Sequence, residues 1–187
     1  VAHRLIQRFT TSNPSPRYVK AVADAFRTGS HDGVTYSGVY GDVGATIAAT
    51  LLDREARSAT LDADPTHGQL REPLLKLFHV LRSFNFGTEE RQFVAFDVLN
   101  TIGQQHMSSP TVFNFYDPLY QPEGPVAEVG LVSPEAELGT GPFMVGFSNA
   151  VTTAIRGTWS YGHLAGRWSP TDPSSALAVV DELDLLL

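Results

Sequence analysis

Cysteine is absent from the 187 residues of this chain, and lysine occurs only twice, at Lys20 and Lys76. Without cysteine these residues form no disulfide and no cysteine-ligated zinc or iron–sulfur site, and they provide no thiolate nucleophile. The formal net charge is −7, and basic residues nowhere cluster, which argues against nucleic acid and anionic membrane surfaces as partners. No apolar run approaches the roughly 18 residues of a membrane span.

The residues that are present are typical of a globular protein rich in loops. A hydrophobic fraction of 42% is enough for a buried core, and 12 prolines with 16 glycines indicate long connections. Apolar residues recur with helical spacing in several segments, whereas no series of alternating strands is found. The sequence therefore predicts a mainly α fold in which long Pro/Gly-rich loops join the helices, with room for one small β-hairpin through Val34 to Tyr40. A single domain, or a fragment of one, accounts for residues 1–187.

Helix starts are the clearest local signals. Pro16 and Pro73 are placed where a first helical turn tolerates proline, and Asp42 is a typical N-cap before a helix at 43–52. Further helices are expected after Thr88, from Pro142, and after 172–173. The residues expected on the buried faces of these helices are Val1, Leu5, Ile6, Phe9, Val19, Val22, Ala23, Phe26, Leu74, Leu77, Phe78, Leu81, Phe84, Phe143, Phe147, Val151, Ile155, Ala176, Val180, Leu183 and Leu187.

Both ends of the chain lie inside helical patterns. The first residues are already amphipathic, with no capping residue ahead of them, and the last three residues are all leucine. We therefore expect this chain to be a fragment of a longer protein.

Five groups of segments together resemble one known family. They are VAHRLIQRF at 1–9 with NPSP at 13–16; GD at 41–42 with AT at 45–46, LLD at 51–53 and EAR at 55–57; GQLREPLL at 68–75 with LRSF at 81–84; GQ at 103–104 with SPTVFNFY at 109–116; and LVSPE at 131–135. In this order, over nearly the whole chain, they resemble the bacterial family catalogued as domain of unknown function 1800.

The resemblance implies a mostly helical, exported bacterial protein that is considerably longer than this chain. It implies that the chain corresponds to the C-terminal half, with the N-terminal half of the same protein as its partner, and that the protein is periplasmic or secreted. The family's activity is not established, and neither the resemblance nor the motifs imply a cofactor. The first functional hypothesis is accordingly a binding or assembly role at the cell envelope.

Candidate binding residues gather in two irregular stretches. Gln104, His106, Asn114 and Tyr116 combine amide, imidazole and phenol groups on one loop, which suits a binding site, although a loop whose phenylalanines anchor it to the core is the alternative. Arg71 is either a substrate-orienting guanidinium or part of a structural clamp at a helix start. Trp159 and Trp168 could stack on a polysaccharide or anchor the core.

Carboxylates provide the second functional hypothesis. Glu135 with Asp117 or Glu72 could act as the acid and base of an extracytoplasmic hydrolase on a polymer such as a glycan, if two carboxyl groups lie about 5 to 9.5 Å apart. No Gly-x-Ser-x-Gly segment occurs, which argues against a serine hydrolase of that type. The histidines lack zinc-ligand spacing, and Pro73 stands where a calcium loop starting at Asp62 needs its last ligand, so the sequence predicts no metal site.

Overall fold

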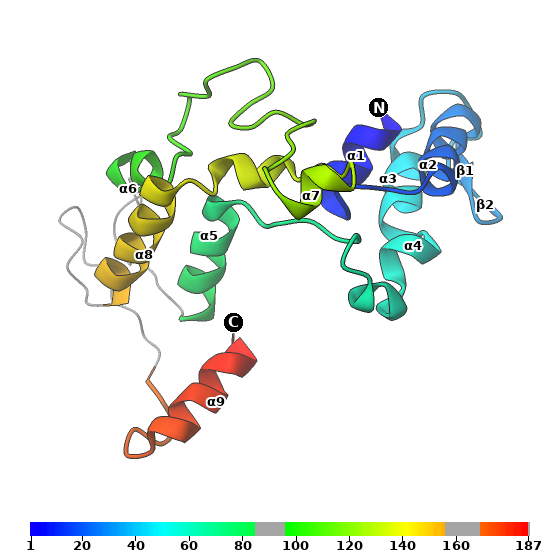
Figure 1. Ribbon diagram of the computed structural model, residues 1–187. Helices are drawn as coiled ribbons and strands as arrows, with labels where there is room; N and C mark the ends of the chain where they lie inside the picture. The colour runs from blue at the N-terminus through cyan, green and yellow to red at the C-terminus, as the bar shows by residue number, and fades with distance from the viewer. Residues whose placement is uncertain (85–95, 156–168, 187) are drawn as a thin grey trace. The chain divides into compact units, whose positions relative to one another are not determined.

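The computed structural model describes residues 1–84, 96–155 and 169–186, drawn in colour in Figure 1. The chain divides into two compact units. Unit 1 comprises Val1–Leu70 and Pro118–Pro134, and unit 2 comprises Arg71–Asp117 and Glu135–Leu187. In the described ranges the regular structure is helical except for one two-stranded hairpin, so the predicted mainly α fold class is confirmed. The prediction of a single domain stays a prediction, and each unit is described by itself.

Unit 1 is built around three helices that pack on one another. Its elements are α1 (Ala2–Phe9), α2 (Pro16–Thr28), β1 (Ser30–His31), β2 (Val34–Thr35), α3 (Val43–Leu52), α4 (Arg54–Arg57), the 3-10 helix η1 (Ala59–Ala63) and α7 (Pro125–Glu128). The first three helices enclose the core of this unit. The buried core residues are Ile6, Tyr18, Val22, Ala25, Ala45 and Ala49.

The helix starts of unit 1 follow the predicted signals. Ser15 caps α2, with its hydroxyl accepting from the Tyr18 N–H at 3.2 Å, and Pro16 occupies the first helical turn. Asp42 caps α3, with Oδ1 accepting from the Ala45 N–H at 2.8 Å. Gly29 ends α2 in the left-handed conformation, at φ 65°, which glycine adopts without strain, and a side chain at this position would also collide with the backbone of Gly38.

The hairpin exists, but its predicted position was wrong. Its strands are 30–31 and 34–35 rather than 34–40, and His31 pairs with Val34. Asp32 and Gly33 both have positive φ, 48° and 77°, as a tight two-residue turn requires. The Asp32-Gly33 pair is therefore the feature of the sequence that indicates where the hairpin turns.

Some predicted core residues of unit 1 were also wrong. Phe9 is 59% exposed and Val1 76% exposed, although both were expected beside Ile6, and Ala23 is exposed as well. Tyr18 takes the central place instead, fully buried, with its hydroxyl donating to the Thr50 carbonyl oxygen. This bond satisfies the polar end of the ring, so that the whole side chain can enter the core.

Unit 2 has a smaller core between α5, α6 and α8. Its elements are α5 (Pro73–Ser83), α6 (Phe96–Thr101), α8 (Gly141–Ile155), α9 (Ala176–Leu186) and, apart from its first residue, the 3-10 helix η2 (Pro134–Leu138). The buried residues that form this core cluster are Leu77, Leu81, Ile102 and Ala150. Gly146 brings α8 against α6 so closely that an added Cβ would collide with the Thr101 carbonyl oxygen.

The helix start at Pro73 and the helix beginning near Pro142 are confirmed. Phe78, at 41% exposed, and Val180, at 58%, were expected to be buried and are not. The helix expected after Thr88 lies largely outside the described residues, as does Leu187. None of the helices within the described ranges is long and apolar enough to cross a membrane.

Candidate functional site

Three of the predicted site residues bond to one another at the start of α5. The carboxylate of Glu72, which is 4% exposed, accepts from the Gln104 amide at 2.9 Å and from the Tyr116 hydroxyl at 3.1 Å. Gln104 Oε1 in turn accepts from the Leu74 N–H at 2.8 Å. Gln104 thus satisfies an N–H of the first helical turn, which has no partner inside the helix. These bonds fasten the loop that carries Gln104 and Tyr116 to α5.

The other predicted site residues of unit 2 differ widely in exposure. Arg71, His106 and Asp117 are exposed, whereas Glu135 is 7% exposed. The backbone N–H of Asp117 donates to the Glu137 carboxylate at 2.6 Å. Trp159 and Trp168, the proposed stacking platform, lie outside the described residues.

Asn114 has a conformational reason to be asparagine. Its φ is 82°, in the left-handed region, where asparagine is tolerated better than most residues. Its N–H donates to the Thr111 carbonyl oxygen at 3.2 Å, which closes a tight turn. The side chain is exposed, so the local geometry accounts for this residue without a ligand.

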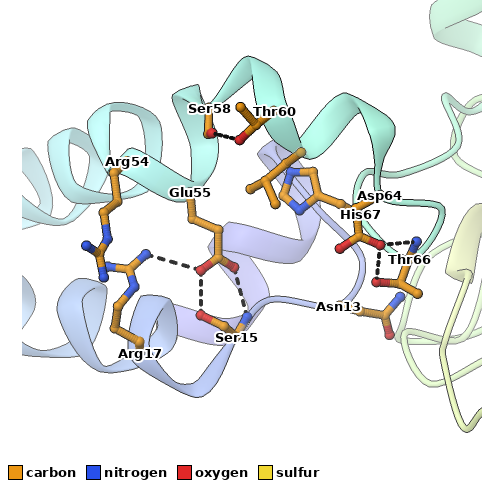
Figure 2. Close-up of a pocket in the computed structure, with 11 residues that line it drawn as sticks. Asn13, Ser15, Arg17, Arg54, Glu55, Ser58, Thr60, Asp64, Thr66 and His67 are labelled. Atoms are coloured by element: carbon orange, nitrogen blue, oxygen red, sulfur yellow. Dashed lines mark hydrogen bonds and ion pairs between the residues drawn. The ribbon is translucent and has the colours of Figure 1, made fainter.

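A polar pocket that the sequence did not reveal lies in unit 1 (Figure 2). Its volume is about 480 Å³, within the usual range of ligand pockets. It lies between the turn that precedes α2, helix α4 and the segment that follows α4 to residue 67. The lining residues are Asn13, Ser15, Arg17, Arg54, Glu55, Ser58, Thr60, Leu61, Asp64, Thr66 and His67.

One wall of the pocket is a closed hydrogen-bond network, which we call the frame and define as Ser15, Arg17, Asp53 and Glu55. Arg17 donates to both oxygens of Asp53, at 2.9 and 2.6 Å, and to Glu55 at 3.1 Å. Glu55 also accepts from the Ser15 N–H at 2.9 Å and from the Ser15 hydroxyl at 2.5 Å. The frame joins the start of α2 to the start of α4 and leaves both Glu55 oxygens occupied.

The charges of the frame stabilise one another. Burial disfavours ionisation of Asp53 and Glu55, yet the pKa of each is lowered. For Asp53 the hydrogen bonds from Arg17 and the Glu55 N–H outweigh burial, and for Glu55 the bonds from Ser15 and Arg17 do so. The bonds to Asp53 raise the pKa of Arg17. The frame is therefore fully ionised at neutral pH, with two carboxylates around one guanidinium.

The opposite wall keeps hydrogen-bonding groups for a ligand. Among the described residues, Arg54 and His67 make no side-chain hydrogen bond or ion pair. Figure 2 shows His67 on the side of the pocket away from Arg17, and Arg54 at the same end as Arg17. Ser58 and Thr60 share one hydrogen bond at 2.7 Å, which leaves each hydroxyl with further capacity. Asp64 accepts from the Thr66 N–H and hydroxyl, at 2.8 and 2.7 Å, through Oδ1 alone.

Comparison with known proteins decides the family. Residues 1–179 match the family described as "Protein of unknown function (DUF1800)". The chain belongs to the DUF1800 family. No curated protein and no solved structure matches the chain.

Three of the four frame residues of this DUF1800 chain lie in segments that already carried the resemblance, and Arg17 directly follows one of them. Ser15 belongs to the NPSP segment, Asp53 to LLD and Glu55 to EAR. Those segments showed family membership, but nothing in their spacing indicated that they meet in space. A search for charged residues flanking helix starts would have found Arg17, Asp53 and Glu55, without pairing them.

No group of three or more His, Asp or Glu side chains in the described part of this DUF1800 chain is arranged to hold a metal ion. The lining of the pocket offers hydrogen-bonding groups of both charge signs. Its two arginines, Arg17 and Arg54, are matched in number by its two carboxylates, Glu55 and Asp64.

Proposed function

We propose that this DUF1800 chain binds a saccharide in the polar pocket of unit 1, as part of an exported protein with a binding role at the cell envelope. One observation carries the proposal: a frame with its hydrogen bonds satisfied stands opposite a wall whose donors and acceptors are open. A frame of this kind holds its shape before a ligand arrives, which reduces the entropy that binding costs.

The open groups suit polyhydroxyl ligands. A sugar hydroxyl both donates and accepts a hydrogen bond, and the open wall supplies acceptors from Asp64 together with the Ser58 and Thr60 hydroxyls. Arg54 adds donors at the end of the pocket where Arg17 lies. The balanced charge of the lining favours an uncharged ligand over a strongly anionic one. Ten of the 11 lining residues are polar, and Leu61 is the exception.

Isothermal titration calorimetry of the purified chain against a panel of neutral and acidic oligosaccharides tests the proposal. We expect neutral sugars to bind, and Arg54→Ala to weaken binding roughly tenfold, as the loss of one hydrogen bond to a charged group does. Arg57→Ala is the matched control, because Arg57 is an exposed arginine on the same helix that does not line the pocket.

Two results would overturn the proposal. One is the absence of binding to every sugar of the panel by a chain that is folded by circular dichroism. The other is an equal loss of affinity in the Arg54 and Arg57 variants, since this would trace the effect to net charge rather than to the pocket.

Export rests on the family resemblance. Fractionation of the source bacterium followed by immunodetection tests it, with the protein expected in the periplasmic or secreted fraction. Recovery from the cytosol alone would contradict both export and the envelope role.

The hydrolase stays a second prediction. It requires carboxylates that are available for proton transfer, and the carboxylate of Glu72 already accepts from Gln104 and Tyr116. Incubation of the chain with polysaccharides, with Glu135→Gln as the control, tests the hypothesis. Product release by the unmodified chain and its loss in the variant would support hydrolysis, whereas full activity of the variant would remove Glu135 from the mechanism.

A further inference from the structure

Unit 2 carries an apolar groove where α5 packs against α8. Its volume is about 350 Å³. Met144 and Val145, which project from α8 into its lining, are 62% and 61% exposed. The lining residues are Pro73, Lys76, Leu138, Phe143, Met144, Val145, Phe147, Ser148 and Asn149. Apolar surface of this kind is stabilised when a partner covers it.

The charge of the groove indicates what kind of partner fits. Lys76 is its only charged lining residue, and it makes no ion pair with another described residue. Helix α5 adds Arg82 and contains no acidic residue. An occupant should therefore combine apolar side chains with carboxylates.

Helix α9 has this chemistry. It carries three acidic residues, Asp181, Glu182 and Asp184, and no basic one. Val180 lies one helical turn from Leu183 on the same side, and Val180 is 58% exposed. No described residue of α9 lines the groove of its own chain.

We propose that the groove between α5 and α8 receives α9 of a second copy of this chain. In this arrangement Val180 and Leu183 cover Met144 and Val145, and the acidic residues of α9 approach Lys76. Two copies exchange their helices reciprocally about a twofold axis, so that the same contact forms twice.

The absence of cysteine makes disulfide trapping a clean test. A chain carrying Val145→Cys is mixed with one carrying Val180→Cys, and the mixture is oxidised and analysed by peptide mapping. We expect a disulfide between position 145 of one chain and position 180 of the other. Val129→Cys replaces Val180→Cys in the control, because Val129 is 67% exposed and lies in unit 1, so that it reports random collisions.

A mixture that forms no more of the 145–180 disulfide than the control overturns the proposal. A chain with both substitutions that closes only within itself also overturns it, since α9 of the same chain then fills the groove. Sedimentation of the unmodified full chain must show a concentration-dependent dimer, and a monomer at all concentrations is the third contrary result.

Charge reversal checks the orientation. Lys76→Glu should weaken dimerisation about two- to fivefold, in line with an exposed ion pair. In a mixed dimer of one Lys76→Glu chain and one Asp184→Lys chain, both contacts pair opposite charges, one through the two substitutions and one through the native Lys76 and Asp184, so dimerisation should be restored. Equal dissociation constants for the unmodified chain and the Lys76→Glu variant would remove Lys76 from the interface.

Discussion

Removing Arg17 should destabilise unit 1 by leaving two carboxylates without their cation. Asp53 is 6% exposed and Glu55 14%, and both lose their hydrogen bonds to the guanidinium in Arg17→Ala. Breaking a fully buried ion pair costs about 3 to 5 kcal/mol, whereas an exposed one is worth at most about 1 kcal/mol. The Arg17 side chain is 38% exposed, and Asp53 still accepts a hydrogen bond from the Glu55 N–H at 2.8 Å. We therefore expect Arg17→Ala to lower the free energy of unfolding by about 2 kcal/mol at neutral pH, between these two limits.

The pH dependence of this loss identifies its cause. In the unmodified chain the pKa values of Asp53 and Glu55 lie below their ordinary 3.8 and 4.5, so their stabilisation is complete above these values and lost as the pH falls through the folded-state values. In the variant, burial without the cation favours the protonated forms. The difference in the free energy of unfolding between the unmodified chain and Arg17→Ala should therefore become smaller as the pH falls from about 5 to about 3.

Urea unfolding followed by far-UV circular dichroism measures the free energy of unfolding. Amide exchange of α2 and α3 peptides assigns the change to unit 1, since a chain of two units need not unfold in one step. Arg57→Ala, which removes an exposed arginine with no ion pair among the described residues, should change the free energy by less than about 0.5 kcal/mol. A loss in Arg17→Ala that stays the same from pH 7 to pH 3 would refute this account of the frame.

Three further predictions concern single side chains. Gly146→Ala should destabilise unit 2 by about 1 to 3 kcal/mol, because the new Cβ collides with Thr101, whereas Gly141→Ala, which meets nothing within 4 Å, should be neutral in the same urea titration. In urea unfolding, Gln104→Leu should lower the free energy of unfolding by about 2 kcal/mol and Tyr116→Phe by about 1 kcal/mol, because Gln104 bonds to both Glu72 and the Leu74 N–H whereas Tyr116 bonds to Glu72. A larger loss in Tyr116→Phe than in Gln104→Leu would contradict this. Asp42→Ala should lower the melting temperature more than Asp42→Asn, because asparagine can still cap the Ala45 N–H, although its amide nitrogen cannot accept from the Ser37 N–H as Oδ2 does at 2.6 Å; equal decreases in melting temperature in scanning calorimetry would contradict a role for the cap.

Local chemistry made the helices predictable. Pro16, Asp42 and Pro73 each act within their own first turn, so their effect can be inferred without knowing the rest of the fold. The buried face depends on neighbouring helices and was harder to infer. Phe9 is apolar and correctly spaced but exposed, whereas Tyr18 is buried because it reaches Thr50, 32 residues away.

The candidate site was predictable only where one residue type has a distinctive chemistry. Glu72, Gln104 and Tyr116 were singled out as polar groups on irregular segments, and they do meet, but their mutual bonds depend on a fold that no spacing rule contains. The pocket of unit 1 was missed for the same reason. Arg17 lies 36 residues from Asp53 and 38 from Glu55, so no local pattern connects them.

The same separation governs when the frame forms during folding. Helices α2 and α3 need only neighbouring residues to start, whereas the bonds of Arg17 to Asp53 and Glu55 require the whole segment between α2 and α4, which contains the hairpin and α3, to fold back on α2. We expect bonds of this kind to form late in folding, so that their loss speeds unfolding more than it slows folding. On this expectation, a variant weakened in the frame refolds at a nearly unchanged rate, whereas its pocket opens more often and releases a ligand sooner.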